Sequence, residues 1–132
     1  MRTFHLLRSL AALGILLALG LSSNVYGQRH EREERHDDRD LIARTQHDLE
    51  RTGRMGTLRG KEKERYDNAM RHLSEFDREL SQGRFDKDKL DAAIEDVHNV
   101  ADHNTLEPQD RNRLNDDLRD LRTLRATRGA AY

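Results

Sequence analysis

One spacing of side chains in the sequence could hold a metal ion. Glu95, His98 and Asp102 follow one another at intervals of three and four residues, so a helix would place them on neighbouring turns. A Glu-x-x-His step is the spacing that di-iron helical bundles use, on faces that point inward. The apolar stripe of this segment centres near Val97, which leaves His98 at its flank and both acids further out. We therefore predict a solvated pair of side chains, with no metal site and no cofactor.

Nucleophilic catalysis has few candidate residues. The chain has no cysteine, and beyond residue 27 its serines are Ser74 and Ser81, which lie in or at the end of one predicted helix. Neither serine has a histidine placed by sequence to activate it. Carboxylate pairs are unavoidable among 25 acidic residues, so they do not indicate acid–base catalysis. We expect a protein that is not an enzyme.

The first 27 residues have the layout of a cleavable secretory signal peptide. Arg2 and Arg8 are basic, residues 10–21 are an apolar run, and Val25 and Gly27 are the small residues that signal peptidase needs before its cut. The apolar run is shorter than the roughly 20 residues of a membrane-spanning helix. We predict cleavage after Gly27, export to the periplasm or the medium, and no stable membrane anchor.

Cleavage would leave a chain of mixed charge. Loss of Arg2 and Arg8 changes the formal net charge from −1 to −3. Arginine greatly outnumbers lysine, which favours pairing with carboxylates. The sequence has no sustained basic stretch, so nucleic acid is not an expected partner. Because no disulfide is possible, stability must come from apolar burial or from association.

The segment that follows the predicted cut carries no apolar side chain. Residues 28–40 mix charges of both signs and cannot bury apolar surface. This composition predicts a disordered leader or a frayed helical extension. We place the folded domain at residues 41–128 and expect residues 129–132 to be loose.

Four segments of that domain repeat apolar residues at three- and four-residue steps, as helices do. The first begins near Leu41, capped by Asp38 or Asp40, and ends at Gly53. The second ends at Gly83, the third follows the N-cap Asp86 and ends at Asn104, and the fourth runs from Pro108 to Gly129. Short connections favour antiparallel neighbours, hence an all-α antiparallel four-helix bundle. Three helices with a loosely docked first helix are the alternative, because the first segment has the thinnest apolar face.

The fourth segment carries a narrow leucine stripe. Leu114, Leu118 and Leu121 follow a coiled-coil spacing, and Leu124 lies beside it. Such a stripe can face the core of the bundle or a second chain. We expect it to take part in weak self-association or in binding a helical partner, with ordinary core as the competing interpretation.

The stretch from Arg65 to Arg125 resembles a group of small exported bacterial proteins of unassigned function. The similar pieces are HLSEFDRELSQGRFDKDKLDAAI and HNTLEPQDRNRL. This resemblance implies export and a helical fold. A fainter one is to the LTxxQ-motif periplasmic stress proteins, which are helical chaperones or metal-stress sensors. Leu106 matches that motif, while Glu107 stands in place of its Thr and Asp110 in place of its Gln.

The sequence therefore predicts an exported, non-enzymatic helical module that binds another protein or itself. The alternative is a periplasmic stress-response chaperone or a metal-responsive helical protein. An exposed apolar face would favour the chaperone, and stoichiometric metal binding would favour the metal-responsive protein.

Overall fold

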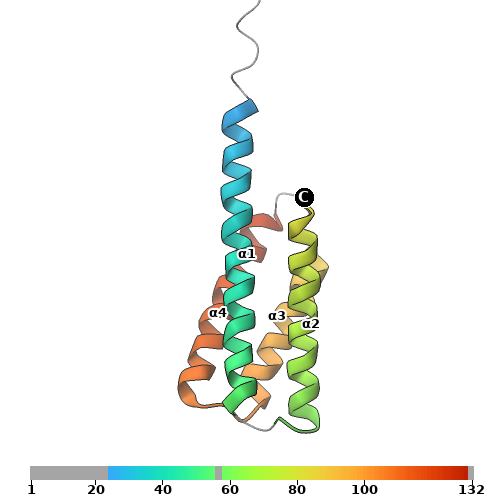
Figure 1. The fold of residues 1–132 in the computed structure, drawn as a ribbon, viewed down its shortest axis with the longest axis vertical. Helices are drawn as coiled ribbons and strands as arrows, with labels where there is room; N and C mark the ends of the chain where they lie inside the picture. Colours follow the sequence, from blue (N-terminus) through green and yellow to red (C-terminus); the bar gives the residue numbers. More distant parts are fainter. Residues whose placement is uncertain (1–23, 56–57, 131–132) are drawn as a thin grey trace, which may run out of the picture.

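The computed structural model describes residues 24–55 and 58–130. These residues form four helices, α1 (Asn24–Met55), α2 (Lys61–Ser81), α3 (Lys87–His103) and α4 (Pro108–Arg128). The helices run up and down side by side (Figure 1). Each packs against its neighbours in the chain, and α1 also packs against α4, while no Cα atoms of the diagonal pairs α1–α3 and α2–α4 lie within 8 Å of each other among the described residues. The bundle is therefore closed, which confirms the predicted four-helix arrangement over the three-helix alternative.

The core contains most of the apolar residues that the periodicity singled out. Every helix contributes to it: Ile42 and Leu49 from α1; Ala69, Leu73, Phe76 and Leu80 from α2; Leu90, Ala93, Val97, Val100 and Ala101 from α3; and Leu114, Leu118, Leu121 and Leu124 from α4. The contribution of α1 is the smallest. Thr45 and Thr52 fill further buried positions on the inner face of that helix, and Asp38 is buried one turn before Ile42.

The predicted ends of α3 and α4 are confirmed. Asp86 is the N-cap of α3, and its Oδ1 accepts a hydrogen bond from the Lys89 amide at 3.1 Å. Pro108 occupies the first turn of α4, where its missing N–H is harmless. The ring of Phe85, just before the cap, packs edge to face on Phe76 with centroids 5.5 Å apart.

The end of α2 is a Schellman motif. Gly83 has a φ of 76°, the left-handed region that glycine enters without strain. Its N–H donates to Leu80 O, and the Arg84 N–H donates to Glu79 O, each with a nitrogen–oxygen distance of 2.9 Å. An apolar contact often accompanies this motif. Here the Arg84 side chain bonds the Glu79 carboxylate at 2.7 Å instead.

The boundaries predicted for the first helix were wrong. α1 begins at Asn24, so Asp38 and Asp40 lie inside the helix and do not cap it. The helix also runs through Gly53. The Tyr66 ring of α2 packs closely on this glycine, since a Cβ at Gly53 would lie 3.3 Å from the ring. Apolar periodicity could not reveal the first turns, since they contain almost no apolar residue.

The structure places residues 28–40, the predicted leader, within α1. Asp38 is buried, and Arg39 makes a bidentate ion pair with Asp77 of α2 at 2.8 and 3.2 Å. Ionic contacts therefore hold the second half of this segment on the bundle. The mobility of the segment stays a prediction. Residues 1–23 of the predicted signal peptide and the last two residues of the chain lie outside the described residues.

Candidate functional site

The three candidate metal ligands form no cluster in the structure. His98 Nε2 lies 3.4 Å from Asp102 Oδ2, one turn along α3, and both side chains are about half exposed. Glu95 is exposed on the same helix. Within the part of the chain that the structure describes, no group of three or more such ligands could hold a metal ion. His98 and Asp102 therefore have the geometry of an exposed ion pair.

The two serines engage the backbone of their own helix. Ser74 Oγ donates to Met70 O at 2.8 Å, and Ser81 Oγ donates to Arg78 O at 2.7 Å. The half-buried pair His72 and Asp96 joins α2 to α3, with Nδ1 and Oδ2 2.5 Å apart. This pair links two helices, and neither serine is hydrogen-bonded to it among the described contacts.

The leucine stripe of α4 is core and not a free surface. The exposed fractions of Leu114, Leu118, Leu121 and Leu124 are 0%, 1%, 0% and 7%. The neighbouring helices α1 and α3 both pack on α4, so a second chain could reach the stripe only if the bundle opened. The structure therefore agrees with the competing interpretation, in which these leucines are ordinary core residues.

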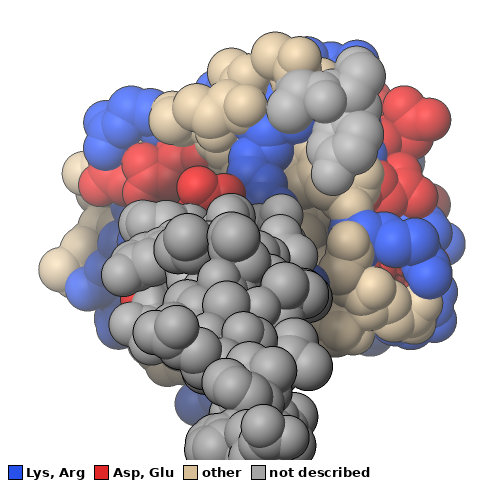
Figure 2. Space-filling model, turned by 90° about the horizontal axis from the view of Figure 1, so that it is seen from above, with Lys and Arg blue, Asp and Glu red and all other residues tan. Residues whose placement is uncertain are grey.

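The surface is charged and has few apolar groups. Among residues 33–54 and 58–130, every Leu, Ile, Val, Met, Phe and Tyr side chain is buried or half-buried. Positive and negative side chains alternate around the rim of the bundle seen end-on (Figure 2). No helix of the described chain is apolar over a length that could cross a membrane.

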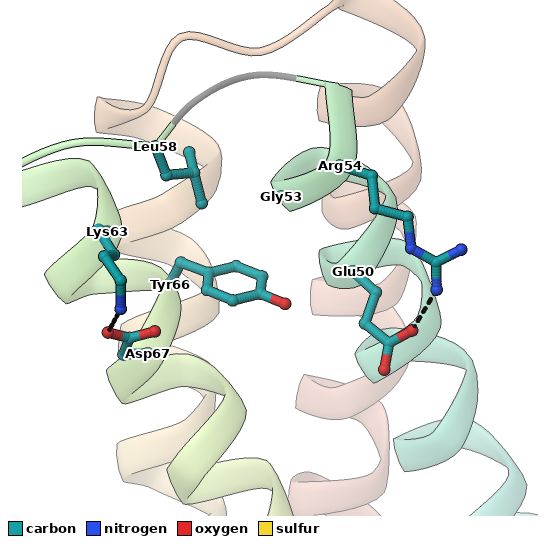
Figure 3. A pocket seen from close by; sticks show the side chains of 7 residues that line it. All are labelled: Glu50, Gly53, Arg54, Leu58, Lys63, Tyr66 and Asp67. Atoms are coloured by element: carbon teal, nitrogen blue, oxygen red, sulfur yellow. Dashed lines mark hydrogen bonds and ion pairs between the residues drawn. The ribbon is translucent and has the colours of Figure 1, made fainter.

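A hollow of about 590 Å³ opens between α1 and α2. Figure 3 shows the Tyr66 ring reaching from α2 towards Gly53 and Glu50 of α1. The charged side chains that line the hollow are already paired with each other. Arg54 pairs with Glu50 on α1, and Lys63 pairs with Asp67 on α2. A ligand would have to break these pairs to use the charges. The hollow therefore offers the tyrosine ring, Leu58 and a rim of charges that are already paired.

The densest polar cluster lies where α1 meets α4. Among the described ion contacts between the two helices, three join an arginine to a well-buried aspartate, and these define the α1–α4 seam: Arg44 with Asp117, Arg51 with Asp110, and Arg128 with Asp38. All three aspartates are buried. Arg44 and Arg51 are seven residues apart, as are Asp110 and Asp117, which repeats the contact every two turns.

Asp117 is the most deeply buried of these acids, with 2% of its surface exposed. Its Oδ1 accepts a hydrogen bond from Arg44 Nε at 2.9 Å, and Arg44 also donates to Asp120 at 2.7 Å. Burial raises the pKa of Asp117 to about 6, against the lowering effect of Arg44. The carboxylate therefore takes up a proton at a mildly acidic pH.

Arg128, at the end of α4, makes the ion contacts at one end of the seam. Its Nη1 lies 2.8 Å from Asp38 and 3.6 Å from Glu34, both on α1. The same guanidinium lies over the Phe85 ring, 5.6 Å from its centroid. One side chain thus joins the end of α4 to α1 and to the α2–α3 connection. Burial raises the pKa of Asp38, although Arg128 opposes the shift.

Sequence reasoning did not find this seam. The available signals were the excess of arginine and the seven-residue steps of Arg44–Arg51 and Asp110–Asp117. Both looked like ordinary solvated helix faces, since apolar periodicity assigns charged positions to the outside.

Comparison with known proteins gives this chain no relatives. No protein-family model, no curated protein and no solved structure matches it.

Proposed function

We propose that the protein is an exported, non-enzymatic helical module that binds another protein through the N-terminal half of α1. The observation that carries this proposal is the shape of the bundle. α1 has 32 residues, and would keep 28 of them after cleavage behind Gly27, against 21 in α2 and in α4. It projects past the ends of the other three helices (Figure 1). A helix that leaves its bundle presents several faces to a partner at once.

The side chains of the bundle support a contact that is polar. The large apolar residues of the bundle are buried in the core or half-buried against it. The described surface therefore presents charged side chains and little apolar area. The start of α1 is rich in alternating charges, as in the run HEREERHDDRD. Charge pairs of this kind set orientation and association rate more than affinity, so a transient partner is expected.

The chaperone alternative receives less support from the same surface. A client-binding chaperone needs an exposed apolar face. The hollow beside Tyr66 is walled by paired charges, and the bundle displays no large exposed apolar side chain over residues 33–54 and 58–130.

Site-specific photo-crosslinking tests the proposal in the native host. A photoreactive residue at His36, whose side chain is 80% exposed on α1, should capture a defined protein. The matched control is Arg119, whose side chain is 70% exposed on the outer face of α4. It should capture little or nothing.

The identity of the captured protein decides the kind of partner. A different protein attached at His36 supports the proposal, and a second copy of this chain redirects it to self-association through α1. No adduct at His36, or the same adducts from both positions, would contradict binding through α1.

A further inference from the structure

α1 is the helix with the smallest apolar contribution to the core. Among residues 33–54 of this helix the buried apolar side chains are Ile42 and Leu49, with Leu41 partly buried, whereas each of the other helices buries at least four. Thr45 and Thr52 are buried beside them, but their hydroxyls donate to Leu41 O and Leu49 O of the same helix. These threonines therefore form no described hydrogen bond to another helix. Since apolar burial provides most of the stability of a packed helix, α1 is the most weakly held.

The polar contacts at the α1–α4 seam are imperfect. Four buried side-chain atoms of the described residues lack a hydrogen bond, and all belong to this seam or its immediate neighbour on α4: Asp38 Oδ2, Arg113 Nη1, Asp117 Oδ2 and Arg128 Nη1. Asp38 and Arg128 touch at 2.8 Å, but outside hydrogen-bond geometry. Asp117 Oδ2 has no partner. A buried charge without full compensation lowers the stability of the element that buries it.

The charges around Asp117 come from both helices of the seam. α1 contributes Arg44 and Asp48, and α4 contributes Asp120. One arginine therefore faces three carboxylates, and this arginine also bonds Asp120. Burial is the main reason that Asp117 favours its neutral form while α1 is docked; Arg44 opposes this effect, and Asp48 and Asp120 add to it more weakly.

We propose that α1 is an arm that opens from the native bundle, and that protonation of Asp117 at the α1–α4 seam holds this arm closed. With α1 undocked, the Asp117 carboxyl lies on the bare face of α4 in water. Docking then buries it, at a free-energy cost that the proton removes. A mildly acidic medium closes the arm, and a neutral medium lets it open.

The size of the response follows from linkage. The pKa of Asp117 is about 6 in the closed state, against a model value of 3.8 for a solvated aspartate. The stabilisation by the proton is complete below the lower value and is lost as the pH rises through about 6. Between pH 7 and pH 5 the opening equilibrium should therefore fall about tenfold.

Asp38, on α1 in the same seam, also has a pKa raised by burial, so its protonation acts in the same direction as that of Asp117. The remaining shifted acids leave this pH window almost untouched. The pKa values of Glu62, Glu79 and Asp91 are lowered, by hydrogen bonds to Thr105, to Lys89 and to Arg125. These groups lie in contacts among α2, α3, α4 and their connections, and they stay ionised from pH 7 to pH 5. Their contacts should weaken only at a lower pH.

Hydrogen exchange of the wild-type protein at pH 7 and pH 5 tests the arm directly. Protection factors, which remove the intrinsic effect of pH on exchange, should rise about tenfold for amides 42–52 at pH 5. Amides in the middle of α2 and α3 should not follow this change. A fall in protection of α1, or equal changes in all four helices, would overturn the proposal.

The variant Asp117→Asn supplies the second arm of the test. A neutral side chain of the same shape should give α1 at pH 7 most of the protection that wild-type reaches at pH 5, and should remove most of the pH response. The control is Asp116→Asn, which removes the same charge from an exposed neighbour paired with Arg119. It should behave like wild-type. A pH response of undiminished size in Asp117→Asn, or its loss in Asp116→Asn, would contradict the role of Asp117. The wild-type series remains decisive if the variant does not fold.

Discussion

At the scale of single residues, Arg128 illustrates how this protein uses arginine. Its guanidinium contacts a buried carboxylate of α1 and the ring of Phe85 at the same time. The stem of an arginine also covers apolar surface, so the residue acts by charge and by packing together. A lysine could not form the same planar contact.

Arg128→Ala should lower the free energy of unfolding by about 2 kcal/mol at pH 7, because it leaves the buried Asp38 carboxylate without its cation. Urea denaturation measures this change. Burial already raises the pKa of Asp38, so the loss should shrink as the pH falls and the carboxyl is neutralised.

Two further variants separate charge from packing at this position. Arg119→Ala removes an arginine from an exposed pair with Asp116 and should change stability by less than about 0.5 kcal/mol. Adding Asp38→Asn to Arg128→Ala should restore part of the lost stability. No restoration would show that the contact with Phe85, rather than the ion pair, is what Arg128 contributes.

At the scale of helices, short-range signals predicted α3 and α4 well. Asp86 and Pro108 mark helix starts through chemistry that acts within one turn, so a single sequence reveals it. Asp86→Ala should lower stability by about 1 kcal/mol, measured by thermal or urea denaturation.

The matched control for that cap is Asp88, an acid in the first turn of α3. Asp88→Ala removes the same charge near the helix start but no cap hydrogen bond. It should reduce stability by only a few tenths of a kcal/mol, through the helix dipole. Equal losses in the two variants would mean that charge, and not the bond to the Lys89 amide, makes Asp86 effective.

α1 shows where prediction from one sequence stops. Its first half is held by ion pairs to residues 38 to 90 positions away, such as Arg39 with Asp77 and Asp38 with Arg128. Gly53 looked like a helix end, yet it lies where the Tyr66 ring packs on the helix. Both features depend on which helices become neighbours, and helical periodicity holds no information on that.

The α1–α4 seam was missed for a related reason. In a helical pattern, Asp110 and Asp117 look solvent-exposed, because charged residues seldom lie in a core without partners. The closure of the four-helix ring places Arg51 and Arg44 opposite them. The fold class followed from the apolar residues alone, whereas the candidate site depends on a contact between the two ends of the domain.

At the scale of the whole molecule, the proposed export has a simple physical test. The signal-peptide layout predicts that the cell removes residues 1–27. α1 would then begin at Gln28 and keep every contact of Glu34 and Asp38. The intact mass of the protein recovered from the cell envelope or the medium should correspond to residues 28–132. A mass that retains the first 27 residues would contradict cleavage.

In the architecture of this protein, α1 closes the bundle by packing on α4 of its own chain. Because the chain has no cysteine, paired cysteine variants report this contact without background. R44C/D120C replaces an ion pair whose atoms lie 2.7 Å apart. R44C/E95C would join α1 to α3, which lie diagonally across the bundle with no Cα atoms within 8 Å of each other among the described residues.

Cross-linking of these two variants with a short bismaleimide at low protein concentration is the most direct measurement. A closed four-helix bundle predicts a rapid link within one chain for R44C/D120C and none for R44C/E95C, both read by mass spectrometry. A missing link in R44C/D120C, a link only between two chains, or equal yields in both variants would contradict the closed four-helix bundle.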